Sequence, residues 1–177
     1  MCPTHQEENM EPIIIEIPSK HWKPRTHPVD LLVVHAMGEW VIDDLGEYHY
    51  CSDWLNILKL SVHAFCLPDG RILQSVSPDH VAFHAKEFNP HSVGMEFIIA
   101  GAHTYQTFLQ RIADVNHPPF TPAQYLSGGW WFRQQAQRFH LTFQHIKSHK
   151  ELAPHRKEDP GAAFNWKTFQ AAFEIHL

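Results

Sequence analysis

Two histidines and an aspartate in this chain have the types and positions expected of a metal site. His35 ends the apolar run LLVVH, His149 follows a short apolar segment around Ile146, and Asp159 lies ten residues further on in a polar loop. Proteins with alternating strands and helices place binding groups where strands meet loops. Two imidazoles and a carboxylate match a catalytic zinc site with its fourth position open to water. On spacing alone, a packed core histidine is the commoner explanation, and a chain with 16 histidines places some at strand ends by chance.

A buried carboxylate is the second chemical signal. Glu96 lies inside VGMEFIIAG, a segment that is typical of a buried strand. Burying a carboxylate is costly unless the group is paired or placed for chemistry. The position favours an acid–base group, and the alternatives are an ion pair with a nearby Lys or Arg, or a side chain that points to solvent.

The segments that would position these residues alternate between strand and helix patterns. Strands are predicted at 13–17, 31–35, 93–101 and around 146, and SVHAFCL-PDG-RILQSV predicts a hairpin over 61–76. Helices are predicted at 40–60, with a break near 51–52, from a cap at Thr121 to 139, and at 165–176. Residues 18–30 and 101–120 are expected to be irregular. This order indicates one α/β domain over residues 13–177, preceded by a flexible segment at 1–12.

Composition excludes several classes of protein. The 177 residues include 14 Lys and Arg against 19 Asp and Glu, a formal charge of −5, which gives no electrostatic surface for nucleic acid or anionic membranes. No apolar run approaches the roughly 20 residues that span a bilayer. The three cysteines have no metal-site or disulfide spacing, and the N-terminus is polar and acidic, unlike a signal peptide. We therefore expect reduced thiols and a cytoplasmic protein.

Five strings carry a family resemblance over about residues 13–170: LLVVHAM, SVHAFCLPDGRILQSV, FHAKEFNPHSVGMEF, FTPAQY and SHKELAPHRKEDPG. Their order and spacing resemble the zinc-dependent N-acetylmuramoyl-L-alanine amidases, relatives of the phage lysozyme-type amidases and the peptidoglycan recognition proteins. IPSKHWKPR and RKEDPGAAFNW resemble the AmpD-like branch, which trims cell-wall fragments during recycling. The resemblance implies a central mixed β-sheet flanked by helices.

The resemblance also implies ligands and catalytic groups. His35, His149 and Asp159 match the family's Zn²⁺ ligands. Lys157 matches a lysine beside the metal, where an ammonium group can stabilise a developing oxyanion. Glu96 matches a glutamate of the AmpD-like branch and is expected to be the general acid–base.

Further matches concern the substrate cleft, where the chain also departs from the family. His84 matches a family histidine near the substrate, and Asn89 is expected on the same rim. Phe83 replaces a tryptophan, Ala36 a polar residue and His155 a glycine, which changes the expected contacts beside the ligands. His63 alternates with Val62, which stands where phage enzymes carry a tyrosine, and is expected to be structural.

The sequence therefore predicts a zinc hydrolase that cleaves the amide bond between N-acetylmuramic acid, in its 1,6-anhydro form, and L-alanine. Its partner would be a muropeptide or peptidoglycan, with no nucleic acid and no membrane, and we expect a monomer. Two alternatives stay open at this point: a lytic amidase or exported effector that attacks intact peptidoglycan, and a peptidoglycan-binding module without catalysis.

Overall fold

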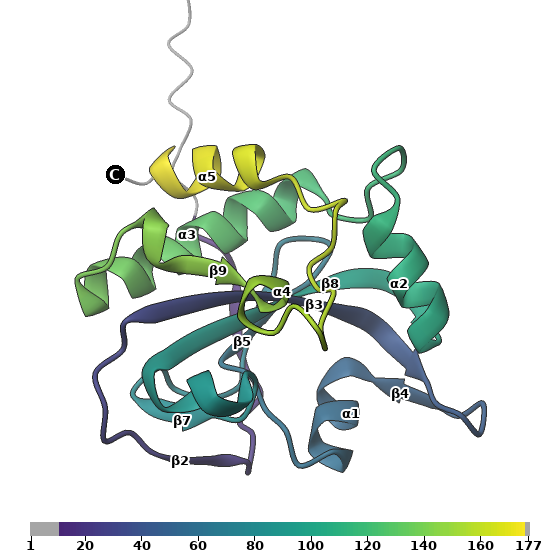
Figure 1. Ribbon diagram of the computed structural model, residues 1–177, viewed down its shortest axis with the longest axis horizontal. Coiled ribbons are helices and arrows are strands. Elements are labelled where there is room, and N and C mark those ends of the chain that lie inside the picture. Colours follow the sequence, from purple (N-terminus) through teal and green to yellow (C-terminus); the bar gives the residue numbers. More distant parts are fainter. Residues whose placement is uncertain (1–10, 176–177) are drawn as a thin grey trace, which may run out of the picture.

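A mixed β-sheet of seven strands divides the molecule into two layers (Figure 1). The computed structural model describes residues 11–175. Along the sheet the strand order is β1-β6-β5-β8-β3-β4, and β9 pairs with β3 beside β4. β2 and β7 form a separate antiparallel pair. β3 and β8 are the two longest strands and run parallel through the centre, so residues on them fix the position of everything around them.

The elements have the following bounds. The strands are β1 (Ile14–Glu16), β2 (Trp22–Pro24), β3 (Leu31–Ile42), β4 (Tyr48–Tyr50), β5 (Ala64–Cys66), β6 (Ile72–Gln74), β7 (His80–Ala82), β8 (Ser92–His103) and β9 (Ile146–Ser148). The helices are α1 (Cys51–Ile57), α2 (Tyr105–Ala113), α3 (Pro122–Phe139), α4 (His149–Leu152) and α5 (Trp166–Ile175), with short 3-10 turns η1 (Lys86–His91) and η2 (Phe143–His145). None of the helices between residues 11 and 175 is long and apolar enough to cross a membrane.

One face of the sheet carries the main core. Helices α3 and α5 cover it (Figure 1), and rings from both meet the strand residue Phe97, which is fully buried. Phe132 and Phe169 lie with ring centroids 6.5 and 5.8 Å from that of Phe97. Aromatic packing of this kind, together with the buried apolar area, provides most of the stability that the fold needs. Packing against α3 and α5 stabilises the sheet from this side. Polar residues can therefore lie on the opposite face.

The opposite face is only partly apolar. A smaller cluster of Val62, Phe65 and Ile98 packs beneath α1. On the same face, further along β3 and β8, the central strands carry His35 and Glu96. The two polar residues that could take part in chemistry therefore lie on the same sheet face as the smaller apolar cluster.

Four sequence predictions need correction. The helix predicted over 40–60 is wrong for most of its length, because β3 continues to Ile42, turns back into β4, and only Cys51–Ile57 is helical. For the same reason His35 lies in the middle of a strand and not at its end: pairing with β8 and β4 extends β3 well beyond the apolar run. Residues 101–120 are not one loop, since β8 reaches His103 and α2 follows; and β2 lies within 18–30.

Other predictions are confirmed. The hairpin forms as the antiparallel pair β5–β6, and the strand predicted at 13–17 forms as β1. Thr121 caps α3, with its hydroxyl accepting from the Gln124 N–H in a capping box. Cys51 and Cys66 are buried free thiols. The flexible segment predicted at 1–12 lies almost wholly outside the described residues, and its flexibility stays a prediction.

Candidate active site

The register of the two central strands brings the first ligand candidate to the acid–base candidate. In the parallel β3–β8 pair, His35 is directly opposite Glu96. Paired residues of neighbouring strands project from the same face of a sheet. The two side chains are therefore neighbours on the polar face, although they are far apart in the sequence.

The short strand β9 delivers the second histidine. β9 runs parallel to β3 with Ser148 opposite Val34, so His149 begins α4 next to His35. The Ser148 hydroxyl accepts from the Glu151 N–H at 3.0 Å, and the Glu151 carboxylate accepts from the Ser148 N–H at 2.7 Å. This capping box fixes where α4 starts. The position of the His149 ring is thus determined by a local sequence signal placed against the sheet.

The loop after α4 returns Asp159 to the same place. The Lys150 N–H donates to the Asp159 carbonyl oxygen at 3.0 Å, which ties the end of the loop to the start of the helix. Just beyond, Gly161 has φ +87° and lies so close to α2 that a Cβ atom would come within 2.3 Å of the Ile112 carbonyl oxygen. Only glycine fits there. The loop is therefore held at both sides of Asp159.

These three side chains form the buried cluster of His35, His149 and Asp159, which are 1%, 4% and 7% exposed. The two Nδ1 atoms are 2.9 Å apart, and they lie 3.3 and 3.1 Å from Asp159 Oδ2. Ligand atoms at about 2.0–2.1 Å from a tetrahedral ion lie about 3.3 Å from one another. The triangle, its nitrogen and oxygen donors and its open side toward the pocket fit a tetrahedral metal ion.

The protonation states of the buried cluster suit a cation. Burial lowers the pKa of His35 to about 4, so the imidazole is neutral at pH 7 and can act as a ligand. Burial works to raise the pKa of Asp159, but hydrogen bonds from His149 and His35 outweigh it and hold that pKa well below its usual range. The aspartate therefore stays ionised. The cluster therefore presents a neutral His35 nitrogen and a negative Asp159 oxygen.

Glu96 has the environment of an acid–base group. It is 9% exposed, and its Oε2 atom is buried without a hydrogen-bond partner among the described residues. Burial, and next the nearby Asp159 carboxylate, raise the pKa of Glu96 well above its ordinary value, while Lys157 opposes them. Among residues 11–175, no Lys or Arg forms an ion pair that would make Glu96 merely structural. Its carboxyl group is available to a ligand in the pocket.

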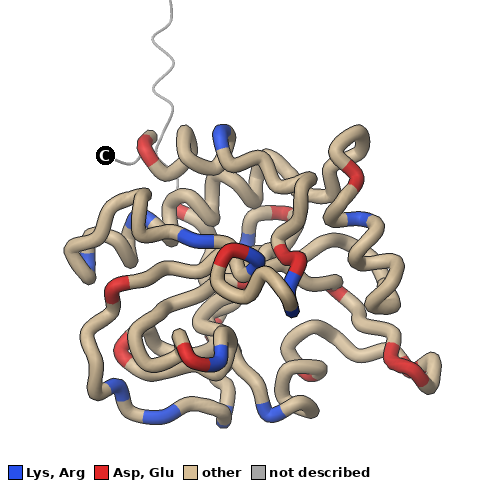
Figure 2. Tube along the Cα trace, in the orientation of Figure 1, with Lys and Arg blue, Asp and Glu red and all other residues tan. Residues whose placement is uncertain are grey.

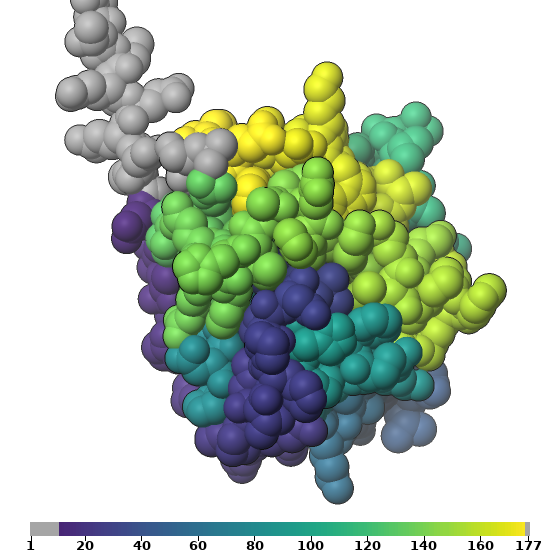
Figure 3. Space-filling view, turned by 60° about the vertical axis from the view of Figure 1, so that its left-hand side comes forward, coloured from purple at the N-terminus to yellow at the C-terminus, as the bar shows by residue number. Residues whose placement is uncertain are grey.

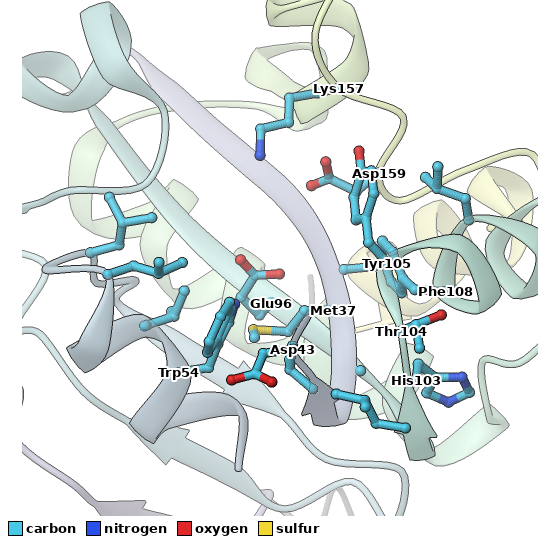
Figure 4. Close-up of a pocket in the computed structure, with 18 of the residues that line it drawn as sticks. Met37, Asp43, Trp54, Glu96, His103, Thr104, Tyr105, Phe108, Lys157 and Asp159 are labelled. Atoms are coloured by element: carbon cyan, nitrogen blue, oxygen red, sulfur yellow. The ribbon is translucent and has the colours of Figure 1, made fainter. Parts of the chain in front are cut away.

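The cluster opens into a cavity of about 770 Å³. Figure 4 shows the Glu96 and Asp159 carboxylates and the Lys157 ammonium group around one space. Beyond them, an apolar arm of the cavity is lined by side chains of α1, including Trp54, and of α2, including Phe108. Among the described residues that line it, Lys157 is the only Lys or Arg. A large cavity with a few polar groups at one end is typical of a small-molecule site.

The two residues predicted to bind substrate are placed differently. His84 lines the cavity, but both ring nitrogens have protein partners: Nδ1 is 2.8 Å from His35 Nε2, and Nε2 is 3.1 Å from Ser92 Oγ. Asn89 is not among the lining residues. Its Oδ1 accepts from the His84 and Ala85 N–H groups at 3.0 and 2.6 Å. The structure therefore associates both residues with the support of His35.

Sequence reasoning missed the apolar arm and the support behind His35. Trp54 and Phe108 come from segments 40–60 and 101–120, whose secondary structure was predicted wrongly in part, so their place in the cavity lining was not predicted. Ser92 and Gly94 precede Glu96 in the same strand at alternate positions, which is the one signal that could have placed them together on its face.

A second group of possible ligands lies at the β3–β4 turn. This turn cluster consists of Asp43, Glu47 and His49 and is partly or fully exposed. Figure 2 shows its acidic residues as a red stretch at the right of the molecule. Asp43 Oδ1 already accepts from the Leu45 and Glu47 N–H groups, each at 2.9 Å, and Oδ2 is 2.9 Å from His49 Nε2. The carboxylate is fully used by the turn.

A mixed sheet that carries a buried His–His–Asp group beside a free carboxyl group has the donor set of a metal-dependent hydrolase. The sequence pattern of the N-acetylmuramoyl-L-alanine amidases matches residues 25–162. This chain belongs to that family.

Relatives and solved structures agree with this assignment. The chain is 30% identical to the 1,6-anhydro-N-acetylmuramyl-L-alanine amidase AmpD of Enterobacter cloacae, over 88% of this chain and 87% of the relative. The Escherichia coli enzyme of the same name is 27% identical over 87% of this chain and 88% of its own. An AmpD crystal structure superposes with a TM-score of 0.69 at 24% identity, covering 94% of this chain and 97% of its own. The Clostridium intestinale amidase LysC has a TM-score of 0.65 at 18% identity, over 94% and 99%. The predicted fold is confirmed.

Proposed function

We propose that this protein hydrolyses the amide bond between 1,6-anhydro-N-acetylmuramic acid and L-alanine in soluble cell-wall peptides, with Zn²⁺ held by His35, His149 and Asp159. The observation that carries the proposal is the buried cluster with Glu96 beside it on the same sheet face. The relatives that are 30% and 27% identical to this chain are both named as 1,6-anhydro-N-acetylmuramyl-L-alanine amidases. Their coverage is almost complete on both sides, which supports a common substrate class.

Zinc in such a site supplies Lewis-acid activation of water and of the scissile carbonyl group. Asp159 contributes one negative charge, so the cation keeps part of its charge. His35 and His149 are neutral donors on rigid elements, which keeps the three donor atoms in place. A rigid set of this kind favours binding of the metal without reorganisation of the chain.

Glu96 is the proposed acid–base residue. Its side chain lines the cavity, and its carboxylate can take a proton from the attacking water. Because the pKa of Glu96 is raised, the protonated form is readily formed and can then deliver the proton to the departing nitrogen of alanine. The same carboxyl group can serve both steps, since its Oε2 atom has no competing partner among residues 11–175.

Lys157 is the proposed oxyanion partner. It borders the cavity on the side opposite the sheet, with its ammonium group directed inward (Figure 4). A cation placed there stabilises negative charge as it develops on the carbonyl oxygen. The chain supplies this charge from the loop that also carries Asp159, so one loop positions both groups.

One assay tests the proposal. The purified protein is incubated with anhydro-N-acetylmuramic acid-L-Ala-D-γ-Glu-L-Lys and, separately, with intact sacculi, each with and without a chelator, and products are identified by mass. We expect free peptide from the soluble substrate, loss of release with chelator, and recovery with zinc. Release from sacculi alone would support a lytic amidase instead. Binding of both substrates without any release would support a binding module.

Two further proposals concern the chain as a whole. We propose that residues 13–177 form the amidase domain, which a variant beginning at Ile13 tests by its activity. We also propose a cytoplasmic location, where buried free thiols such as Cys51 and Cys66 stay reduced. Fractionation of the producing cells tests the second proposal.

A further inference from the structure

A chain of hydrogen bonds leads away from the metal site behind His35. The Nδ1 atom of His35 faces His149 within the buried cluster. The Nε2 atom on the other side of the ring is 2.8 Å from His84 Nδ1. The other nitrogen of His84 is 3.1 Å from the hydroxyl of Ser92, a fully buried residue on β8. The rings of His35 and His84 meet edge to face at a centroid distance of 5.0 Å.

The donor and acceptor roles in this chain follow from ligation. A metal takes the lone pair of His35 Nδ1, so the single proton of the neutral ring lies on Nε2. That N–H donates to His84 Nδ1. The proton of the neutral His84 ring then lies on Nε2 and donates to Ser92 Oγ. Each link fixes the next, so ligation of His35 sets the tautomer of His84, and the His84 acceptor in turn holds the His35 ring in its orientation.

The strand leaves room for this contact at one position. A Cβ atom on Gly94 would lie 2.6 Å from His84 Nδ1 and 3.1 Å from His35 Nε2. Gly94 has no positive φ and pairs in a regular register with Val33, so its backbone would accept any residue. The absence of a side chain therefore serves the approach of the two imidazoles.

Arg25 holds the outer end of the chain. Its guanidinium donates to the carbonyl oxygens of His80 at 2.7 Å, Pro90 at 2.9 Å and Ser92 at 3.1 Å. Figure 3 shows the segment around residue 25, in dark violet-blue, lying directly against teal residues of the 80–95 region. Arg25 thus ties segments that are distant in sequence together around Ser92. This fixes the position of the outer end of the hydrogen-bond chain.

We propose that His84 and Ser92 form a positioning relay that orients the ligand His35 and strengthens zinc binding, with Gly94 providing the space for it. His84 is then a positioning residue and not a substrate-binding one. The inference rests on the proposed function in one respect, namely that His35 is a zinc ligand. Outer partners of this kind typically change metal affinity by about 10–100-fold.

The relay supports only one of the two histidine ligands. His149 Nε2 is buried and has no hydrogen-bond partner in the part of the chain that the structure describes. His35 is therefore the ligand whose orientation a second residue controls. This asymmetry predicts that substitutions that remove the contact between His84 and His35 lower the zinc affinity.

The test measures the zinc dissociation constant of the full chain by competition with a chelator at fixed pH. We expect His84→Ala and Gly94→Ala to weaken binding about 10–100-fold, and Ser92→Ala to weaken it less. His84→Gln keeps an acceptor toward His35 and a donor toward Ser92, so it should recover most of the affinity. His91→Ala is the matched control, because His91 is on the same segment but pairs with Asp30 on the surface.

Two further readouts separate positioning from other roles. The visible spectrum of the cobalt-loaded protein should change in His84→Ala and return toward the original in His84→Gln. Unfolding of each metal-free variant separates loss of stability from loss of affinity. If His84→Ala fails to fold, Gly94→Ala and Ser92→Ala decide the question.

The outcomes distinguish this inference from the proposed function. Unchanged zinc affinity in His84→Ala, with a raised KM, would overturn the relay and restore a substrate-binding role. Equal loss in His91→Ala would overturn it as well, since the effect would then be general. A wild-type chain that binds no zinc would remove the metal site itself, and the relay with it.

Discussion

Two clusters of histidine and acid in this molecule contain similar residue types but differ in every property that decides metal binding. The buried cluster of His35, His149 and Asp159 joins three separate elements, β3, α4 and the loop that follows it. The turn cluster of Asp43, Glu47 and His49 spans a single hairpin turn. In the first, donor atoms face one another across a space that opens to a cavity. In the second, the carboxylate is already used by its own turn.

The difference is visible in what each aspartate accepts. Among the described residues, the hydrogen-bond partners of Asp159 Oδ2 are the two imidazoles, at 3.3 and 3.1 Å. A bound cation can take the place of these hydrogen bonds. The pKa of Asp43 is lowered first by its hydrogen bond to His49 and next by the Glu47 N–H. A metal at the turn would have to break hydrogen bonds that hold the backbone. Proximity of ligand types is therefore insufficient, and spare coordination capacity in a rigid, buried setting is the deciding property.

The largest effect is expected for His149→Ala. Loss of an outer hydrogen-bond partner typically weakens metal binding by about 10–100-fold. Removal of a ligand should weaken zinc binding further, and peptide release should fall to background. Zinc content after dialysis and release of L-alanyl peptide measure the two effects. Retention of stoichiometric zinc by the variant would break the comparison, because it would place the metal elsewhere.

The next largest effect is expected for Glu96→Gln. The variant keeps the shape of the side chain but cannot act as a base, so turnover should fall about 10²–10⁴-fold. Zinc binding should be retained, since Glu96 is outside the buried cluster. The rate of peptide release and the zinc content of one preparation provide both measurements. A near-normal rate would remove the acid–base assignment.

An intermediate effect is expected from pH on the metal-free protein. Burial lowers the pKa of His63 to about 3 and that of His35 to about 4. The unfolded chain takes up these protons near pH 6.5, whereas the folded chain does not, so stability falls as pH drops below 6.5. Each residue contributes about 1.4 kcal/mol per pH unit until its folded pKa is reached.

The measurement is urea unfolding at several pH values between neutrality and pH 4, in chelator. His63 Nδ1 accepts from the Gly94 N–H at 3.0 Å, and its Nε2 lies 3.1 Å from the His80 carbonyl oxygen, so the neutral ring is fully bonded. His63→Gln should reduce the slope of the unfolding free energy against pH by the amount that corresponds to one proton. An unchanged slope would show that His63 does not resist protonation.

The smallest effect is expected for His49→Ala in the turn cluster. Its contact with Asp43 is near the surface, so stability should change by about 1 kcal/mol or less. Zinc stoichiometry should stay at one per chain and zinc affinity should be unchanged. Metal analysis and thermal unfolding check both statements. Loss of zinc in this variant would show that the turn, and not the buried cluster, holds the ion.

The sequence was most informative where chemistry and local signals coincide. The capping box at Thr121 and the hairpin over 61–76 were predictable because neighbouring residues specify them. The family strings selected His35, His149 and Asp159 as a set, and the structure brings them together. The segment 40–60 was mispredicted because its apolar spacing fits a helix loosely, while pairing with neighbouring strands makes its first part extended.

Residue types, their order along the chain and their local signals were sufficient to determine the family, the α/β class and the residues capable of chemistry. Only the tertiary structure decided that Glu96 is opposite His35, that His84 supports His35 from behind, and that Asp43 is consumed by its own turn. The physical reason is that register, burial and hydrogen-bond saturation arise from contacts between distant segments. Those contacts determine which of several similar side chains is free to bind and react.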